Sequence, residues 1–451
     1  MTFDAFRIKV QETAAALGIS EYELYYMEED SQSVSVMEGE IQEFSSDVTG
    51  GVTFRCKTGG KMGYCSTELL SAEEAERIVK AAAENAAAIE TEEEGIIFAG
   101  SPRYEKTEEA AQEAAPVGEM TDLAMALYQA ALAEDSRVQP SSSAEVSQGK
   151  TTVRLVNSAG LDLSRTGTLQ ISFQSAIVRE GTEQYNSYEP SEGPFGEVDI
   201  QKTAKTAVQK ALDQISGEPV PSGNYPVVFE NTCFADLLMA FSGVFSAKNA
   251  QQGLSLLAGK EGEQIAADIV TLTDDPFCAG HQAAFDGEGV ATAKKNVIEN
   301  GVFKTLLYNL QTARKAGKET TGNGSRASYH APVDIAPFNF YLQPGTVSAE
   351  EIWKLATDAS EGTALLITEL AGLHAGLNPM TGDFSLMAGG YRLENGQKTS
   401  WVNGITVSGN FYELLKKISA VGSDLKFGFP RGTTRIGSPS VYCGRMPIAG
   451  K

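Results

Sequence analysis

In the first part of the chain, apolar and polar residues alternate over short stretches, and this pattern predicts a sheet with covering helices. Residues 3–17 instead repeat apolar side chains every three or four positions, which indicates an amphipathic helix. Ser71 followed by Glu74 matches a capping box and predicts a second helix up to about Ala88. Between these helices the predicted strands are 23–28, 33–37, 41–46 and 52–57, with turns at Glu38-Gly39, Gly50-Gly51 and Gly59-Gly60.

The same order of elements recurs farther along. The predicted elements there are a helix over 120–132, strands over 151–156 and 169–178, and a helix over 200–215. We therefore expect two similar helix–strands–helix subdomains, 1–90 and 118–220, built on a shared sheet. The link 89–118 is rich in Glu and Ala and is expected to be exposed.

The segment 216–224 reads SGEPVPSGN and is the best candidate for a domain boundary, because Gly and Pro break both periodicities. Beyond it the chain becomes richer in predicted strands. Asn300-Gly301 and Asn395-Gly396 predict type I′ hairpins, and Ser348 with Glu351 predicts a capped helix. The predicted fold class is α+β, with an N-terminal α/β domain over 1–220 and a β-rich domain with a few covering helices over 221–451.

Charge and cysteine content narrow the class of protein. The formal net charge of −23 repels phosphate groups, so direct binding to nucleic acid or to an anionic membrane surface is disfavoured. The N-terminus does not resemble a secretory signal, and the sequence has no apolar run of 18 residues. Five cysteines without a CxxC pair fit a reducing compartment, so a cytoplasmic protein is expected.

Candidates for metal or nucleophilic chemistry are weak when taken from the residues alone. The three histidines, His281, His330 and His374, have no ligand spacing such as HxxxH, and HExxH is absent. Cys278 stands three residues from His281, but neighbours in sequence seldom hold a nucleophile–base geometry. Asp286 and Glu288 flank Gly287 in a tight loop, where a solvated turn is favoured over a cation site.

The polar loop Thr321–Arg326, with sequence TGNGSR, has two interpretations. Residues 322–327 read GNGSRA and match the GxGxxA part of a dinucleotide-binding fingerprint. No buried strand precedes them, so dinucleotide binding is disfavoured. Gly322, Asn323 and Gly324 either line a substrate-binding surface or form a turn that needs glycine backbone freedom. The residues alone leave both interpretations open.

The apolar positions of residues 234–245 recur at three- and four-residue steps, so this segment is predicted to be a helix buried in the core. It contains no histidine. Taken alone, it carries no chemistry.

Several longer motifs, in their order and spacing, make the chain similar to the TldD/PmbA family, whose members are often called modulators of DNA gyrase. The resemblance covers nearly the whole length. It rests on VMEGEIQEFSSDVTGGVTFRC and GKMGYCST in the first half, and on DGEG (286–289), VIENGVFKTLLYNLQTARKAG (297–317), TGNGSR (321–326), LQPG (342–345), TGDFSLMAGGYRLENG (381–396) and ISAVGSDL (418–425) in the second.

The resemblance implies a zinc peptidase fold with two branches. The TldD-like branch carries HExxxH on a helix and a metal-binding cysteine in a later loop. In this sequence Met239, Ala240 and Val244 occupy the positions of the His, Glu and His, and none of them binds zinc or moves a proton. The loop after ISAVGSDL has no cysteine. The resemblance therefore implies the PmbA branch, also called TldE, with the peptidase-like C-terminal domain lacking its metal site.

What this branch implies is a non-catalytic subunit that partners a TldD-like metallopeptidase in degrading unfolded peptides and maturing peptide precursors. No cofactor is expected in this chain, and zinc is expected in the partner. A homodimer in isolation is compatible with this reading, and no contact with DNA is expected.

Two rival hypotheses come from other classes. One is an active hydrolase with an unrecognised site, for which Asp286, Glu288 and His281 are the first suspects. The other is a stand-alone homodimeric peptide-binding protein, marked by peptide affinity without a partner or turnover.

Overall fold

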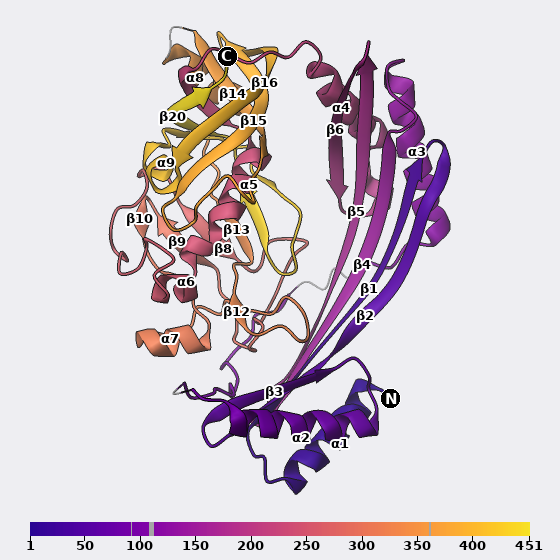
Figure 1. Cartoon of the computed structure of the whole chain (residues 1–451), viewed down its shortest axis with the longest axis vertical. Helices are drawn as coiled ribbons and strands as arrows, with labels where there is room; N and C mark the ends of the chain where they lie inside the picture. The colour runs from indigo at the N-terminus through magenta and orange to yellow at the C-terminus, as the bar shows by residue number, and fades with distance from the viewer. Residues whose placement is uncertain (92, 108–111, 360–361) are drawn as a thin grey trace.

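A computed structural model describes residues 1–91, 93–107, 112–359 and 362–451. Its first part consists of one long sheet and the helices on it (Figure 1). The elements of this part are α1 (Phe3–Ala16), β1 (Tyr22–Met37), β2 (Glu40–Thr58), β3 (Lys61–Thr67), α2 (Ala72–Ala88), α3 (Val117–Glu134), β4 (Ser143–Asn157), β5 (Asp162–Glu180), β6 (Glu183–Glu192), the 3-10 turn η1 (Phe195–Glu197) and α4 (Ile200–Asp213).

The sheet has the strand order β3-β2-β1-β4-β5-β6, and every neighbouring pair is antiparallel. It curves along its length and turns one face to the rest of the molecule (Figure 1). The helices cover its other face in two groups, with α1 and α2 over one end and α3 and α4 over the other. Both predicted units therefore contribute strands to one shared sheet.

The strands are longer than the alternation predicts, and one predicted turn is wrong. Glu38-Gly39 does form a hairpin turn, with positive φ at both residues. Gly50-Gly51, however, lies inside β2. A Cβ atom on Gly50 would stand 2.5 Å from the carbonyl oxygen of Met27, so this glycine permits close approach of β1 and does not end the strand. The predicted link 89–118 falls partly on residues outside the description.

The second part of the chain contains many shorter elements. They are β7 (Gly223–Phe229), α5 (Asn231–Phe241), the 3-10 turn η2 (Ser242–Phe245), α6 (Ala247–Gln251), β8 (Leu272–Asp275), β9 (Lys295–Glu299), β10 (Val302–Phe303), α7 (Leu310–Ala316), β11 (Gly324–Ser325), β12 (Asp334–Ile335), β13 (Asn339–Leu342), α8 (Ala349–Asp358), β14 (Thr363–Ala371), β15 (Asp383–Glu394), β16 (Gln397–Asn410), α9 (Phe411–Lys417), β17 (Ala420–Val421), β18 (Lys426–Phe427), β19 (Arg435–Ser438) and β20 (Val441–Ala449).

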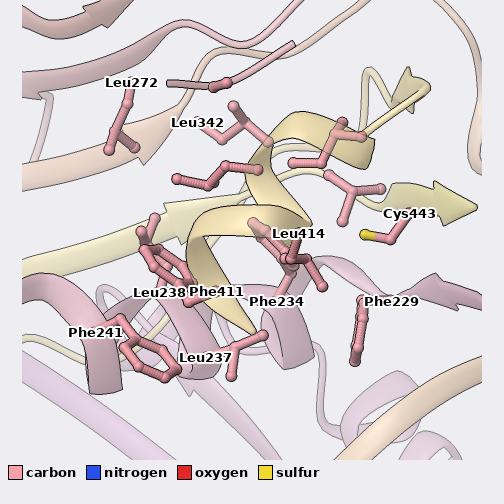
Figure 2. Close-up of a cluster of buried hydrophobic side chains, with 14 of the residues drawn as sticks. Phe229, Phe234, Leu237, Leu238, Phe241, Leu272, Leu342, Phe411, Leu414 and Cys443 are labelled. Atoms are coloured by element: carbon pink, nitrogen blue, oxygen red, sulfur yellow. The ribbon is translucent and has the colours of Figure 1, made fainter. Parts of the chain in front are cut away.

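These strands form two main sheets around one large apolar core. One sheet has the order β16-β15-β14-β7-β20-β17 and curls until β16 also pairs with β20; the other has the order β10-β9-β8-β13-β19-β18. Helices α5 and α9 pack in the core beside them, where Phe241 stacks on Phe411 with ring centroids 4.5 Å apart (Figure 2). The α+β fold class with a β-rich C-terminal region is confirmed.

Local signals in this part are confirmed where turn or cap chemistry is involved. Asn300-Gly301 and Asn395-Gly396 have positive φ at both residues, as type I′ hairpins require. Ser348 and Glu351 form a complete capping box at the start of α8. Among the described residues, no helix combines the length and the apolar character needed to cross a bilayer.

A buried ion network joins the two parts of the molecule. Glu23 on β1 lies directly opposite Arg55 on β2, and Nη2 of Arg55 donates to Oε2 of Glu23 at 2.7 Å. From the second part, Nη2 of Arg326 donates to Oε1 of Glu23 at 2.6 Å. The Arg326 guanidinium also lies over the Tyr25 ring, 4.4 Å from its centroid. The side chains of Glu23 and Arg326 are 0% and 1% exposed, so this junction is shielded from water.

The loops DGEG and TGNGSR build the side of the network that belongs to the second part. Oδ1 of Asp286 accepts hydrogen bonds from the backbone N–H groups of Glu288 and Val290, and its Oδ2 accepts one from Gly324 at 2.7 Å. Nε of Arg326 donates to the Gly287 carbonyl at 2.9 Å. A Cβ atom on Gly324 would lie 2.8 Å from Cγ of Glu288, so glycine is what lets the two loops touch.

The carboxyl groups in this network are electrostatically unbalanced. Glu23, Asp286 and Glu288 supply three carboxyl groups against the two guanidinium groups of Arg55 and Arg326. Burial and the nearby Glu288 raise the pKa of Asp286 to about 7. Burial also raises the pKa of Glu288, against the lowering effect of Arg55 and Arg326.

Replacing Arg326 with Ala should destabilise the protein strongly, because Glu23 would keep a buried carboxylate with only one partner. We expect the free energy of unfolding to fall by about 3–5 kcal/mol, measured by urea denaturation. The control is Arg103→Ala, which breaks an exposed pair with Glu105 and should cost less than about 1 kcal/mol. Equal losses in the two variants would contradict a special role for the junction.

The raised pKa values predict a pH-dependent stability. A carboxyl group with a raised pKa in the folded state stabilises the fold most at low pH, where it is protonated in both states. For Asp286 this contribution is lost as pH rises from about 4 through about 7. Glu288→Gln removes the neighbouring charge, so its stability should fall less between pH 5 and 8 than that of the unchanged protein.

The measurement is the free energy of unfolding of both proteins across this pH range. Glu413→Gln is the control, because the pKa of the Glu413 carboxyl is lowered by Lys416 and Lys417 and the group stays ionised throughout. Parallel curves for the unchanged protein and Glu288→Gln would show that the carboxyl pair does not titrate there.

Candidate functional site

Helix α5 has one face in the core and one face turned toward the sheet of the first part (Figure 1). Its buried residues are Cys233, Phe234, Ala235, Leu237, Leu238 and Phe241. Figure 2 shows Phe234, Leu237, Leu238 and Phe241 among the side chains of the core. The rest of α5 carries Asp236, which is exposed, and Met239 and Ala240, which are half-buried. The exposed Gly243 follows in η2. The start of α5 is held by Asn231, whose Nδ2 donates to the Asp424 carbonyl at 3.0 Å.

The three residues that the sequence resemblance places at the family's metal positions lie on or just after α5. Met239 and Ala240 are in its last turn, while Val244 lies in the 3-10 turn η2 and is 1% exposed within the core. A thioether, a methyl group and an isopropyl group offer neither the imidazole nor the carboxylate that a peptidase zinc site needs. These residues do not fit a zinc ion, and no catalytic step can be assigned to them.

The loop between β18 and β19 crosses from the second part to the sheet of the first. Phe429 of this loop packs on Phe173 of β5, with ring centroids 4.8 Å apart. At the start of β19, Nη2 of Arg435 lies 3.1 Å from Oε2 of Glu192 on β6. This loop stands where the resemblance places a metal-binding cysteine, and its residues here make contacts between the two parts.

The cysteines nearest to α5 are buried in the core. Cys443 on β20 is 0% exposed and Cys233 on α5 is 2% exposed. Burial raises the pKa of both thiols, so both stay protonated at neutral pH. Throughout the residues that the structure describes, no group of three or more His, Cys, Asp and Glu side chains is arranged to hold a metal ion.

Acidic groups surround the exposed face of α5. The phenol of Tyr188 on β6 interacts electrostatically with Asp236 on α5 and with Glu369 on β14. The surrounding protein removes water from both carboxyl groups and raises their pKa, with Arg431 opposing this at Asp236 and Lys210 opposing it at Glu369. The two parts of the chain therefore bring acidic and aromatic side chains together beside Met239 and Ala240.

Among the described residues, no hydrogen bond joins His281 or Cys278 to the carboxyl groups of Asp286 and Glu288. Burial and Arg435 lower the pKa of His281 to about 4, and its ring bonds to the Thr433 backbone. Burial and Asp275 raise the pKa of Cys278 to about 11, so the thiol is protonated at neutral pH. Asp286 and Glu288 are 2% and 4% exposed inside the ion network, where they meet no histidine.

The loop residues Gly322, Asn323 and Gly324 are all buried, with Asn323 0% exposed. Nδ2 of Asn323 donates to Oδ2 of Asp274 at 2.7 Å and to the Ala336 carbonyl at 3.1 Å. These contacts give the loop a packing role and favour the turn interpretation. A role of the three residues in substrate binding stays a prediction.

The sequence did not predict which residues hold the DGEG and TGNGSR loops in position. Glu23 and Arg55 are scattered charged residues in the sequence, and only the strand register brings them together beneath DGEG and TGNGSR. Asp236 and Glu369 were also missed, although Asp236 interrupts the apolar pattern of its helix and thus gave a signal for an exposed face.

Family models match three consecutive segments of the chain. They are PmbA/TldA metallopeptidase domain 1 over residues 22–86, the central domain over 111–215 and the C-terminal domain over 222–450. A curated relative, Metalloprotease PmbA of Escherichia coli O157:H7, is 26% identical and aligns over 93% of this chain and 90% of its own length.

Solved structures agree over almost the full length. A candidate modulator of a DNA gyrase from Thermotoga maritima is 32% identical, covers 99% of this chain and 100% of its own, and has a TM-score of 0.89. TldE from Thermococcus kodakarensis shares the fold with a TM-score of 0.87 at 22% identity, with 99% of each chain covered. With matching models from residue 22 to residue 450, the chain belongs to the PmbA/TldD family of metallopeptidase-like proteins.

Proposed function

We propose that this chain is a non-catalytic subunit of the PmbA/TldE type and works as the partner of a TldD-like zinc metallopeptidase. The pair acts in the cytoplasm on unfolded peptides and on the leader segments of peptide precursors. Zinc and the catalytic glutamate belong to the partner. This chain contributes surface and structural support to the assembled enzyme.

The observation that carries the proposal is the chemistry of α5 and the turn after it. Met239, Ala240 and Val244 stand where the family's peptidases place ligands and a base, and Val244 is part of the core. A single substitution could be a local accident, but here the histidines, the glutamate and the later cysteine are all replaced. The fold around these residues is nevertheless complete and well packed, which supports a role of this domain other than metal chemistry.

The surroundings of α5 support a role for part of this helix in contacting a peptide substrate. Asp236 is exposed and interacts electrostatically with Tyr188 from the first part. Met239 and Ala240 are half-buried, and Met239 packs partly against the core. On a metal-bearing partner, the position of Met239 would carry a zinc-binding histidine and the position of Ala240 the glutamate base. Two related subunits can therefore present equivalent helices to one peptide while only one of them cleaves it.

The rival hydrolase hypothesis loses support from the positions of its suspects. A carboxyl group that is to activate water or bind a substrate must be reachable, and Asp286 and Glu288 are almost fully buried. In the described part of the chain, His281 shares no hydrogen bond with either carboxyl group, and it bonds to the Thr433 backbone. The stand-alone peptide-binding protein remains an outcome that the experiment below distinguishes.

Zinc content and peptidase activity should separate this chain from its partner. The purified chain is expected to hold no stoichiometric zinc and to cleave no unfolded peptide, whereas a mixture with a TldD-like subunit should form a complex and cleave. Zinc is measured by elemental analysis, complex formation by sedimentation, and cleavage by mass spectrometry.

A partner whose HExxxH glutamate is replaced by Gln serves as the control. It should still form the complex but remove all cleavage, which assigns the chemistry to the partner. Stoichiometric zinc or turnover by this chain alone, particularly turnover lost in Asp286→Ala, would overturn the proposal. Peptide binding without any complex would favour the stand-alone peptide-binding protein.

A further inference from the structure

Strand β2 has a free edge over more than half of its length. It pairs with β1 from Glu40 to Cys56, but β3 covers its other side only from Val52 to Thr58. In the described part of the chain, residues 40–50 therefore have a strand neighbour on one side alone. At about 3.3 Å per residue, this free edge is roughly 36 Å long. Alternate N–H and C=O groups along such an edge are available to another strand.

Apolar side chains follow this edge on one face of the sheet. Ile41, Phe44 and Val48 are 51%, 50% and 68% exposed. Their partners on β1 are Val36, Val34 and Asp30, and residues directly opposite each other share a face. Val34 and Val36 pack in the cluster beneath α3, so the three exposed side chains continue that apolar layer to the rim of the sheet. Exposed apolar side chains along an unpaired edge favour pairing with another strand.

Acidic side chains follow the same edge on the opposite face. Glu43 and Asp47 pair with Ser35 and Ser31 on β1, and both are exposed at the rim. If residues 40–50 paired fully with the same segment of a second copy, Glu43 of each chain would face Asp47 of the other. Like charges in directly opposite positions destabilise a strand pair, so charge disfavours a second copy and favours a basic occupant.

We propose that the β2 edge, residues 40–50, docks a β-strand of the TldD-like partner in which apolar residues alternate with Lys or Arg. The apolar residues of that strand would meet Ile41, Phe44 and Val48, and its basic residues would meet Glu43 and Asp47. Backbone hydrogen bonds along the edge supply affinity, and the alternation fixes the register. This inference rests on the proposed function, because it names the surface through which the subunit joins its partner.

The test measures association of the full chain with a TldD-like subunit by sedimentation. Glu43→Lys combined with Asp47→Lys should weaken binding about tenfold, because two cross-strand charge pairs turn from attraction to repulsion. The matched control combines Glu183→Lys with Glu197→Lys, the same charge change at exposed residues at and beyond the opposite edge strand, β6. The control should bind like the unchanged chain.

Hydrogen exchange on the unchanged chain gives a second readout that needs no variant. Amides within residues 40–50 should become protected in the complex, while those of β6 should keep their exchange rates. A complex that forms equally with the Lys variant and leaves these amides unprotected would overturn the edge proposal while the proposed function stands. Absence of any complex would remove the proposed function and this inference with it. Protection of the residue 40–50 amides when this chain self-associates without a partner would assign the edge to a second copy and overturn the proposal.

Discussion

The arrangement of the whole molecule depends on the buried carboxylate of Glu23 and the two guanidinium groups that bind it. Arg55 comes from the neighbouring strand and Arg326 from a loop about 300 residues later, so one side chain fixes the position of the C-terminal part on the sheet. Buried ion pairs gain little over apolar packing, but they tolerate only one geometry. The cost of leaving any of these charges unpaired is what makes the relative placement of the two parts specific.

The relative placement of the two parts also determines which residues contact each face of α5. The apolar face is held by the core in Figure 2, while the other face meets residues from the sheet of the first part. The loop before β19 and the start of β19 also contact the first part, because Phe429 packs on β5 and Arg435 pairs with Glu192 on β6. The positions where the resemblance expects metal ligands are used here for packing and for contact between the parts.

Much of the fold could be predicted from the sequence where local chemistry decides the structure. The Asn-Gly hairpins, the Ser348 cap and the apolar period of α5 depend on neighbours a few residues away. The ion network could not be predicted, because a bulge between Ser35 and Val36 shifts the register of β1 and β2 by one residue. Without that shift Glu23 would face Phe54 in place of Arg55. The DGEG and TGNGSR motifs were visible, but their burial depends on contacts with Leu161 and Glu23, which are more than 100 residues away in the sequence.

The pairing of β7 with β20 has a consequence for how the protein is made. Gly223 at the start of the C-terminal region pairs with Ile448 near the end of the described chain, and β20 lies between β7 and β17 in the sheet. During synthesis the long N-terminal sheet can fold as soon as its own strands have left the ribosome. The later region must instead wait with β7 and the apolar face of α5 uncovered until its final strand emerges. Until β20 is available, these apolar surfaces of the C-terminal region stay exposed, and exposed apolar surface promotes aggregation.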